Sequence, residues 1–500
     1  MTPLTIPAMN LLPAYPEIFL LVAASAILII DMFVSDARRS LTYVLSLGAI
    51  LVCAAINLAY LFKGGTTFTF NGMFVSDPMS NVLKIATYLI VAMSLVYCRD
   101  YITDQGIASG ERGGEFYPMC LFALLGQMVM ISASNFLSIY LGVELMSLTL
   151  YAMIALKRDD ARATEASMKY FILGAVSSGF LLYGMSMVYG ATGSLDLAVI
   201  AKELAAGGPG HTIMVFGLVF IVSGLAFKIG VVPFHMWIPD VYQGAPSAVT
   251  LMIGGAPKIA AFVITLRLLV EGMIVFAVDW QQMLVILAVL SMALGNITAI
   301  AQTSVKRLLG YSTIAHMGFM LLGLLSGVVG GNAYSAPAAY SSAMFYVIVY
   351  VLTTIGAFGV LIVLSRPGYE ADHLDDFKGL HKRSPATALV MLLVMFSLTG
   401  IPPTVGFYAK FVVVNAVVVA GMTWLAVFAV MTSLVGAFYY LRVVKLMYFD
   451  DPITDIPITK PRLDLRIVLA LNGASILILG VVPGSLLQPC LSAITRTLAP

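Results

Sequence analysis

The chain has 500 residues, of which 60% are hydrophobic and only 10% are charged, whereas a soluble domain carries about 25% charged residues. Its 27 basic and 25 acidic residues give a net charge of +2, which by itself identifies no partner. This composition excludes a soluble enzyme, a nucleic-acid-binding protein and a disordered protein, and it indicates an all-α protein with many membrane spans.

The hydropathy pattern contains fourteen apolar stretches, each long enough to cross a bilayer as a helix. The expected spans are 17–34, 41–62, 78–97, 116–133, 135–156, 169–190, 212–232, 247–271, 280–300, 308–329, 341–364, 386–416, 421–447 and 466–487. The eighth, twelfth and thirteenth are long enough to tilt or to contain a break. No loop is large enough for a separate soluble domain.

The basic residues orient the chain, because Lys and Arg concentrate on the inner side of a membrane. With the N-terminus outside, nineteen basic residues lie on the inner side, three on the outer side and five within spans. We therefore predict that both termini lie on the outer side of the membrane.

Four charged residues lie deep in the predicted spans, where an ionisable side chain costs roughly 2.5–3.5 kcal/mol and usually marks an ion path. They are Glu144 in the fifth span, Lys228 in the seventh, Lys258 in the eighth and Lys410 in the twelfth. Lys410 follows Pro402-Pro403, which must interrupt its helix because proline removes hydrogen-bond donors and clashes with the preceding turn. We predict that these residues transfer protons. The alternative is that single lysines are structural cations paired with a carboxylate or with carbonyl groups.

The distance between Glu144 and Lys228 decides how firmly that lysine holds its proton. Two unit charges 4 Å apart attract by about 4 kcal/mol at an effective dielectric constant of 20. Moving one charge across 100 mV costs about 2.3 kcal/mol. Making or breaking such a pair would therefore suffice to drive one proton against a membrane potential.

Other ionisable residues allow more than one interpretation. His316 in the tenth span could carry protons between the lysines or be a hydrogen-bonded packing residue. His235 lies in a stiff connector rich in proline and aromatic residues, where a structural role competes with a gating or proton-uptake role. Lys84 and Arg267 lie near outer span ends and are expected to extend to the interface as anchors.

No motif for a cofactor or a metal is visible. Cys53, Cys98, Cys120 and Cys490 are far apart and form no C-x-x-C pattern. No G-x-G-x-x-G or P-loop sequence opens a βαβ unit. We expect no cofactor in this chain and interpret the cysteines as small apolar residues.

The order of the spans suggests an internal duplication. Residues 1–115 hold three helices, 116–271 a first five-helix repeat, 280–447 a second, and 466–500 a last transmembrane helix and tail. An odd number of spans per repeat makes the second repeat inverted, an arrangement that places broken helices along an ion path. We predict breaks in the seventh and twelfth helices, which carry Lys228 and Lys410.

Several stretches resemble the antiporter-like membrane subunits of respiratory complex I, the NADH-quinone oxidoreductase. The most specific covers 232–250, and its portion Asp240-Val-Tyr-Gln-Gly-Ala-Pro246 is similar to the subunit N branch, the bacterial counterpart of mitochondrial subunit 2. The supporting stretches are Glu144 with Ser147-Leu-Thr-Leu-Tyr151, Ala256-Pro-Lys258, Tyr311-Ser-Thr-Ile-Ala-His-Met-Gly318 and Gly400-Ile-Pro-Pro-Thr-Val-Gly-Phe407 with Lys410.

The resemblance implies a proton-translocating subunit in the bacterial inner membrane, with both termini periplasmic. It implies that Glu144 pairs with Lys228, that Lys258 is the central relay residue, that Lys410 is the outlet and that His316 lies on the same axis. FMN and iron–sulfur clusters would lie in partner subunits, and subunits M, K and J with the peripheral arm would be the partners. The alternative functions are a subunit of a multi-subunit cation/proton antiporter and a membrane scaffold with vestigial charges.

Overall fold

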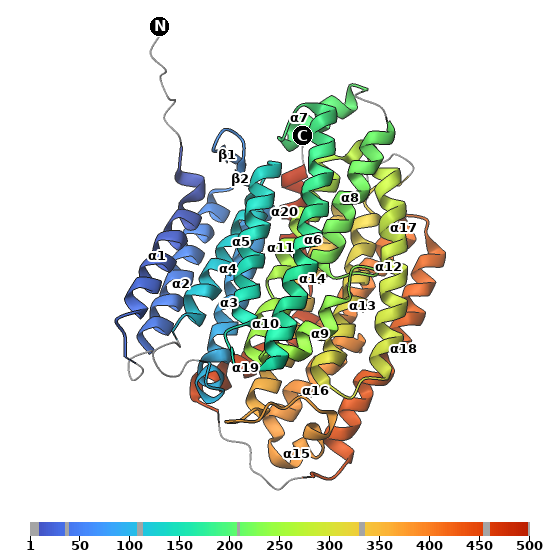
Figure 1. The fold of residues 1–500 in the computed structure, drawn as a ribbon. Coiled ribbons are helices and arrows are strands. Elements are labelled where there is room, and N and C mark those ends of the chain that lie inside the picture. Colours follow the sequence, from blue (N-terminus) through green and yellow to red (C-terminus); the bar gives the residue numbers. More distant parts are fainter. Residues whose placement is uncertain are drawn as a thin grey trace.

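The computed structural model describes residues 10–35, 40–107, 114–207, 211–329, 336–453 and 461–498. They form one helical bundle with a small hairpin at its upper end (Figure 1). The helices are α1 (Tyr15–Asp31), α2 (Ser40–Lys63), α3 (Pro78–Asp104), α4 (Phe116–Ser132), α5 (Phe136–Ile154), α6 (Ala161–Thr192), α7 (Leu197–Ala205), α8 (His211–Ile229), α9 (Trp237–Gly244), α10 (Ser247–Gly254), α11 (Pro257–Leu266), α12 (Ala277–Ile300), α13 (Val305–Leu325), α14 (Ala336–Leu364), α15 (Leu380–Arg383), α16 (Pro385–Thr399), α17 (Val405–Val419), α18 (Thr423–Phe449), α19 (Leu463–Val481) and α20 (Gly484–Leu498).

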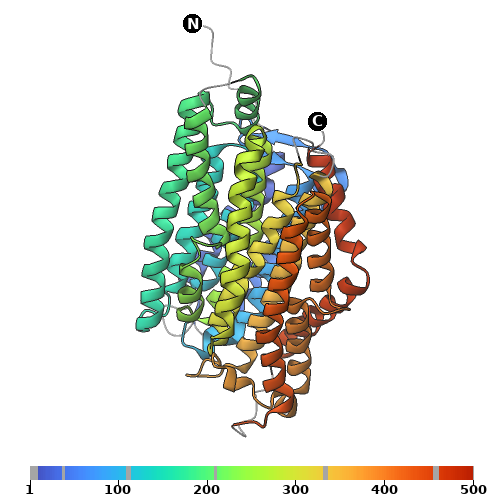
Figure 2. The ribbon, with the colours of Figure 1, turned by 90° about the vertical axis from the view of Figure 1, so that its right-hand side faces the viewer.

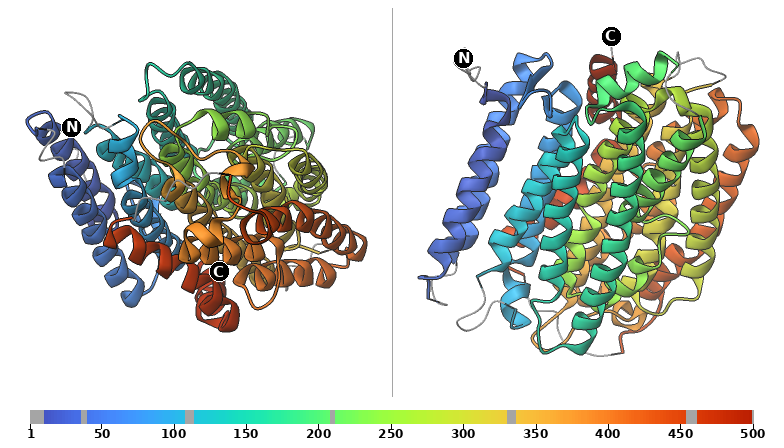
Figure 3. Two further views of the ribbon diagram at one scale, coloured as in Figure 1. Left: turned by 90° about the horizontal axis from the view of Figure 1, so that it is seen from below. Right: turned by 45° about the horizontal axis from the view of Figure 1, so that its top comes forward.

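The predicted class, an all-α protein with many spans, is confirmed. Among the described residues, twelve helical segments are long and apolar enough to cross a membrane, and α4 and the broken pair α16–α17 complete the fourteen expected spans. The most apolar part of α14 and of the segment 247–272 is buried throughout. In contrast, α1 and α2 pack side by side at one edge (Figures 1 and 3), which lies at the back in the view of Figure 2. The helix α1 begins, and α20 ends, at the same upper end of the bundle (Figure 1).

Helix breaks occur at three places in the interior. The predicted break in the twelfth span separates α16 from α17, and it contains Gly400 with a φ of +89°. The seventh span is divided in the same way, because α8 ends at Ile229, Gly230 has a φ of +90°, and α9 starts only at Trp237. The eighth span is also interrupted, between α10 and α11, while α18 runs without a break. Each interruption frees backbone carbonyls inside the bundle.

Smaller elements in the connections were not predicted. Strands β1 (Thr67–Thr69) and β2 (Phe74–Ser76) form an antiparallel hairpin whose turn includes Asn71 and Gly72, both with positive φ. Asn-Gly between alternating residues is a strong hairpin signal, so the sequence did contain this information. The expected tail after 487 belongs instead to α20, which is amphipathic and packs on α14 and α3.

The start of α6 gives a first testable prediction. The Asp160 carboxylate accepts hydrogen bonds from the amides of Arg162 (2.9 Å) and Ala163 (3.4 Å) and lies 3.5 Å from the Lys157 ammonium. Partial burial opposes these contacts, but together they lower the pKa of Asp160. Because the folded-state pKa lies below the unfolded one, this carboxylate stabilises the fold above about pH 4, and the contribution is lost as pH falls through the folded-state pKa.

We expect Asp160→Ala to lower the free energy of unfolding by about 1 kcal/mol at pH 7. Asp160→Asn keeps an acceptor at the cap and is expected to lower the free energy of unfolding by a smaller amount. Because asparagine does not ionise, this variant should lack the stabilisation that wild type gains as the pH rises above about 4. Thermal unfolding in detergent between pH 3.5 and pH 7 measures both effects. Equal stability of wild type and the alanine variant at pH 7 would contradict the assignment.

Candidate functional site

Lys228 is buried near the end of α8 and is held by hydroxyl groups. Its Nζ donates to Ser147 Oγ at 2.9 Å and lies 3.5 Å from Ser178 Oγ. Ser147 comes from α5 and Ser178 from α6, so three helices meet at this ammonium. All its hydrogen-bond acceptors in the described residues are therefore neutral.

Glu144 does not form the direct ion pair with Lys228 that the sequence suggested. It lies one turn before Ser147 on α5, close enough to act electrostatically on Lys228 without a salt bridge. Its Oε1 is buried and has no hydrogen-bond partner in the described part of the chain, and the neighbouring Leu141 and Leu148 are exposed. The carboxylate thus acts on the lysine electrostatically, whereas Ser147 of the same helix accepts the hydrogen bond of the ammonium.

Lys258 lies at the start of α11, with only 1% of its surface exposed. Its Nζ donates to the carbonyl of Ile229 at 2.8 Å and lies 5.0 Å from the centre of the Trp237 ring. Ile229 is the last residue of α8 and follows Lys228, so the two lysines occupy adjacent places at the same helix break. The break creates the site, because only a terminated helix offers such a carbonyl to an ammonium.

Lys410 on α17 occupies the corresponding place at the other break. Its Nζ donates to the carbonyls of Leu398 and Thr399, both at 2.9 Å, and to Ser433 Oγ at 2.8 Å. Leu398 and Thr399 are the last two residues of α16. Lys258 and Lys410 are therefore bound in the same way, by carbonyls at the negative end of an interrupted helix.

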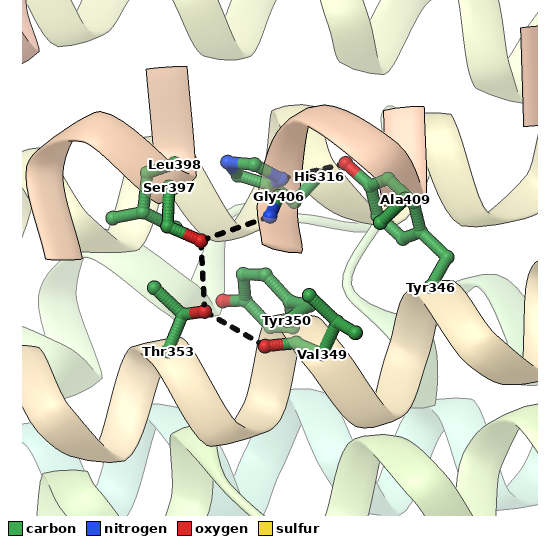
Figure 4. Close-up of a pocket in the computed structure, with 9 residues that line it drawn as sticks. All are labelled: His316, Tyr346, Val349, Tyr350, Thr353, Ser397, Leu398, Gly406 and Ala409. Atoms are coloured by element: carbon green, nitrogen blue, oxygen red, sulfur yellow. Dashed lines mark hydrogen bonds between the residues drawn. The ribbon is translucent and has the colours of Figure 1, made fainter. Parts of the chain in front are cut away.

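His316 is buried on α13 between two tyrosine hydroxyls. Its Nδ1 lies 2.7 Å from Tyr346 Oη and its Nε2 lies 3.0 Å from Tyr440 Oη. A small cavity of about 10 Å³, room for about one water molecule, adjoins the imidazole (Figure 4). Leu398, whose carbonyl binds Lys410, lines the same cavity (Figure 4). His316 and Leu398 thus line one small cavity, and Lys410 is bound to the carbonyl of Leu398.

Three hydroxyl groups lie between the Lys258 segment and His316. Tyr350 Oη donates to Thr313 Oγ1 at 2.7 Å, and the Tyr350 ring lies 5.1 Å from the imidazole of His316. The buried Tyr242 hydroxyl lies beside Thr313 and against Gly254, where an added Cβ would come within 3.1 Å of it. The sequence analysis missed this group, since no local pattern joins residues of α9, α13 and α14.

His235 lies in the connector between α8 and α9. It is half-buried, and its Nδ1 is buried without a hydrogen-bond partner among the described residues. This nitrogen lies in the connector that follows the first helix break.

Lys84 and Arg267 are not interfacial anchors, and that prediction is wrong. Each side chain is 1% exposed. Lys84 forms an ion pair with Glu17 of α1, and Arg267 forms ion pairs with Asp77 and Glu271, both at 3.0 Å. The carboxylates stabilise these buried cations in place of the water that a snorkelling side chain would reach.

The buried cations therefore fall into two groups. Lys84, Arg267 and Lys306 each form a salt bridge with a carboxylate, whereas Lys228, Lys258 and the half-buried Lys410 form none with any described residue. An ammonium in an ion pair leaves a buried, unpaired anion behind when it loses its proton. An ammonium bound only by neutral oxygens does not, so the second group is the one suited to releasing protons.

Comparisons with known proteins identify the family of the chain. The profile of the family described as NADH:quinone oxidoreductase/Mrp antiporter, transmembrane, matches residues 133–436. These residues contain all the lysines, the glutamate and the histidines predicted to transfer or admit protons.

The chain is 61% identical to the NADH-quinone oxidoreductase subunit N of Herminiimonas arsenicoxydans over 98% of this chain and 99% of that one. It is similar to a chain of respiratory complex I from Thermus thermophilus, with 32% identity, a TM-score of 0.79 and coverage of 95% and 98% of the two chains. A chain of the Mrp complex from Dietzia sp. shares the fold, with a TM-score of 0.84, 19% identity and coverage of 98% and 97%. The chain thus belongs to the antiporter-like membrane family of NADH-quinone oxidoreductases, in its subunit N branch.

Proposed function

We propose that this chain is a proton-translocating membrane subunit of a bacterial NADH-quinone oxidoreductase, moving protons while partner subunits transfer electrons from NADH to a quinone. The observation that carries the proposal is that, within the described ranges, Lys228, Lys258 and Lys410 are bound by neutral oxygens only. Family membership supplies the reaction to which their protonation would be coupled. The chain itself performs no redox step in this proposal.

The proposed relay runs along the middle of the bundle. Glu144 biases the protonation of Lys228, which shares a helix break with Lys258. From Lys258 the hydroxyls of Tyr242, Thr313 and Tyr350 lead toward His316, and the small cavity leads on to Lys410. His235 would admit protons at the first break. The pairing implied by the resemblance is replaced here by a longer-range interaction between Glu144 and Lys228.

The surroundings of the chain follow from the same proposal. It would cross the inner membrane with both termini periplasmic, contact subunits M, K and J, and depend on FMN and iron–sulfur clusters held by other subunits. The division into three N-terminal helices, two inverted five-helix repeats and a C-terminal segment remains a prediction, supported by the matching lysine sites at the two breaks.

The experiment uses the whole complex, purified from its membrane and reconstituted into vesicles. We expect NADH oxidation to drive proton movement that a protonophore abolishes. Lys410→Met is expected to lower the number of protons moved per NADH, because it removes the ammonium beside the His316 cavity while leaving the helix break intact. The exposed inner-side residue Lys382, paired with Asp451, provides a control as Lys382→Gln.

Proton movement driven by an imposed Na⁺ or K⁺ gradient, with none on NADH addition, would instead establish the antiporter alternative. Unchanged pumping by the Lys410 variant would remove it from the relay. A complex that pumps normally with every one of the three lysines replaced in turn would support the scaffold alternative.

A further inference from the structure

The helices α9 and α10 form a short helical hairpin that reaches Lys258 from both sides. Each has eight residues, so each is about 12 Å long. The residue that starts α9 is Trp237, whose ring faces the Lys258 ammonium, and α10 leads within four residues to Lys258 itself. The open end of the hairpin therefore contains the relay lysine, and its apex is the turn Ala245-Pro246-Ser247.

A partly buried ion pair from two other parts of the chain is bound to this apex. Lys306 at the start of α13 donates from Nζ to the carbonyl of Ala245 and to Glu370 Oε2, both at 2.8 Å. Glu370, in the connection between α14 and α16, accepts at Oε1 from the amide of Ser247 at 3.2 Å and from the Tyr101 hydroxyl of α3. The Lys306 side chain is 1% exposed and that of Glu370 is 23% exposed.

The two charges match the two helix ends that they touch. Ala245 caps the C-terminus of α9, where a cation is favourable, and Ser247 opens α10, where an anion is favourable. Charge-assisted hydrogen bonds of this kind are roughly twice as strong as neutral ones. Within the hairpin, Thr250 Oγ1 adds a hydrogen bond to the Tyr242 carbonyl at 3.1 Å.

We propose that Lys306 and Glu370 are positioning residues for the proton relay. By fixing the apex of the hairpin they hold Trp237 and the α8 terminus against Lys258. Lys306 does not itself pass protons onward, because its ammonium is bound by a carboxylate, unlike the three relay lysines. This inference deepens the proposed function and rests on it.

A chemical test of position is independent of pumping. In the assembled complex, Lys258→Cys places a thiol at the open end, where the native side chain is 1% exposed and all four native cysteines are buried. Labelling by a small maleimide is expected to become several-fold faster when Lys306→Met or the milder Glu370→Gln is added. Lys306→Arg keeps a cation on the Ala245 carbonyl and is expected to leave the labelling rate near its starting value, as is the control Lys382→Gln.

The activity test uses native Lys258. Lys306→Met and Glu370→Gln are expected to lower the protons moved per NADH several-fold, while Lys306→Arg retains most pumping, because positioning needs the cation and not its proton. If the neutral variants are labelled faster but the wild-type complex shows no NADH-driven pumping, the proposed function is wrong and the positioning role of Lys306 and Glu370 is still supported. The positioning role would be overturned by an unchanged labelling rate in both neutral variants. It would also be overturned if Lys306→Arg lost as much pumping as Lys306→Met.

Discussion

Replacement of Lys258 by Met is expected to slow proton transfer through this chain by about 100-fold or more, the loss commonly seen when a positioned proton carrier is removed. The methionine retains the apolar length of the side chain but has no ammonium to bind the Ile229 carbonyl. The measurement is protons moved per NADH oxidised by the reconstituted complex. The rate of electron transfer to a quinone, measured with a protonophore present, checks that the complex is assembled.

The variant Lys258→Arg distinguishes between two roles of Lys258, that of a proton relay and that of a structural cation. A guanidinium can still bind the carbonyl at the helix break, yet it stays protonated at any physiological pH. The relay therefore predicts that the arginine variant fails as badly as the methionine variant. Recovery of pumping by arginine would show that Lys258 serves only to hold the helix end. Lys306→Arg is the matched control, since there the same exchange is expected to be tolerated.

Arg267→Met is expected to destabilise the folded chain by about 3–5 kcal/mol, the cost of removing one partner from a buried ion pair. The change leaves the carboxylate of Asp77, which is 2% exposed, without its cation, and also frees Glu271. It further removes two hydrogen bonds to the Ile131 carbonyl at the end of α4. Thermal unfolding in detergent provides the measurement.

Two further variants identify the cause of that loss. Adding Asp77→Asn and Glu271→Gln to Arg267→Met removes the unpaired charges and is expected to recover part of the stability, since asparagine can still cap α3. Arg442→Met is a control, because Arg442 is only part-buried, donates to a carbonyl and has no carboxylate partner among the residues that the structure describes. A triple variant no more stable than Arg267→Met would show that lost packing causes the effect.

The sequence contained most of the fold because apolar length and proline positions are local properties. Pro402-Pro403 predicted the break beside Lys410, since no helix accommodates two such residues. The partners of the charged residues could not be predicted in the same way. Glu17 and Lys84 are 67 positions apart, and only helix packing brings them together.

The candidate site could be predicted only in part for the same reason. The residue types Glu144, Lys228, Lys258, His316 and Lys410 could be selected by their depth in apolar stretches. The serines that bind Lys228, the carbonyls that bind Lys258 and the hydroxyls beside His316 could not, because they depend on how three or more helices meet. Ser147 alone had a local signal, since it lies one turn after Glu144 on the same helix.

The interrupted helices have an electrical consequence. Carbonyl dipoles favour an ammonium without cancelling its charge, so each proton gained at Lys258 or Lys410 adds a full positive charge to the membrane interior. Occupancy at one break therefore repels occupancy at the other, over distances that no hydrogen bond spans. Arg267 takes no part in this coupling, because carboxylates already compensate its charge. The protonation states of the two breaks are thus coupled electrostatically through the low-dielectric medium between them.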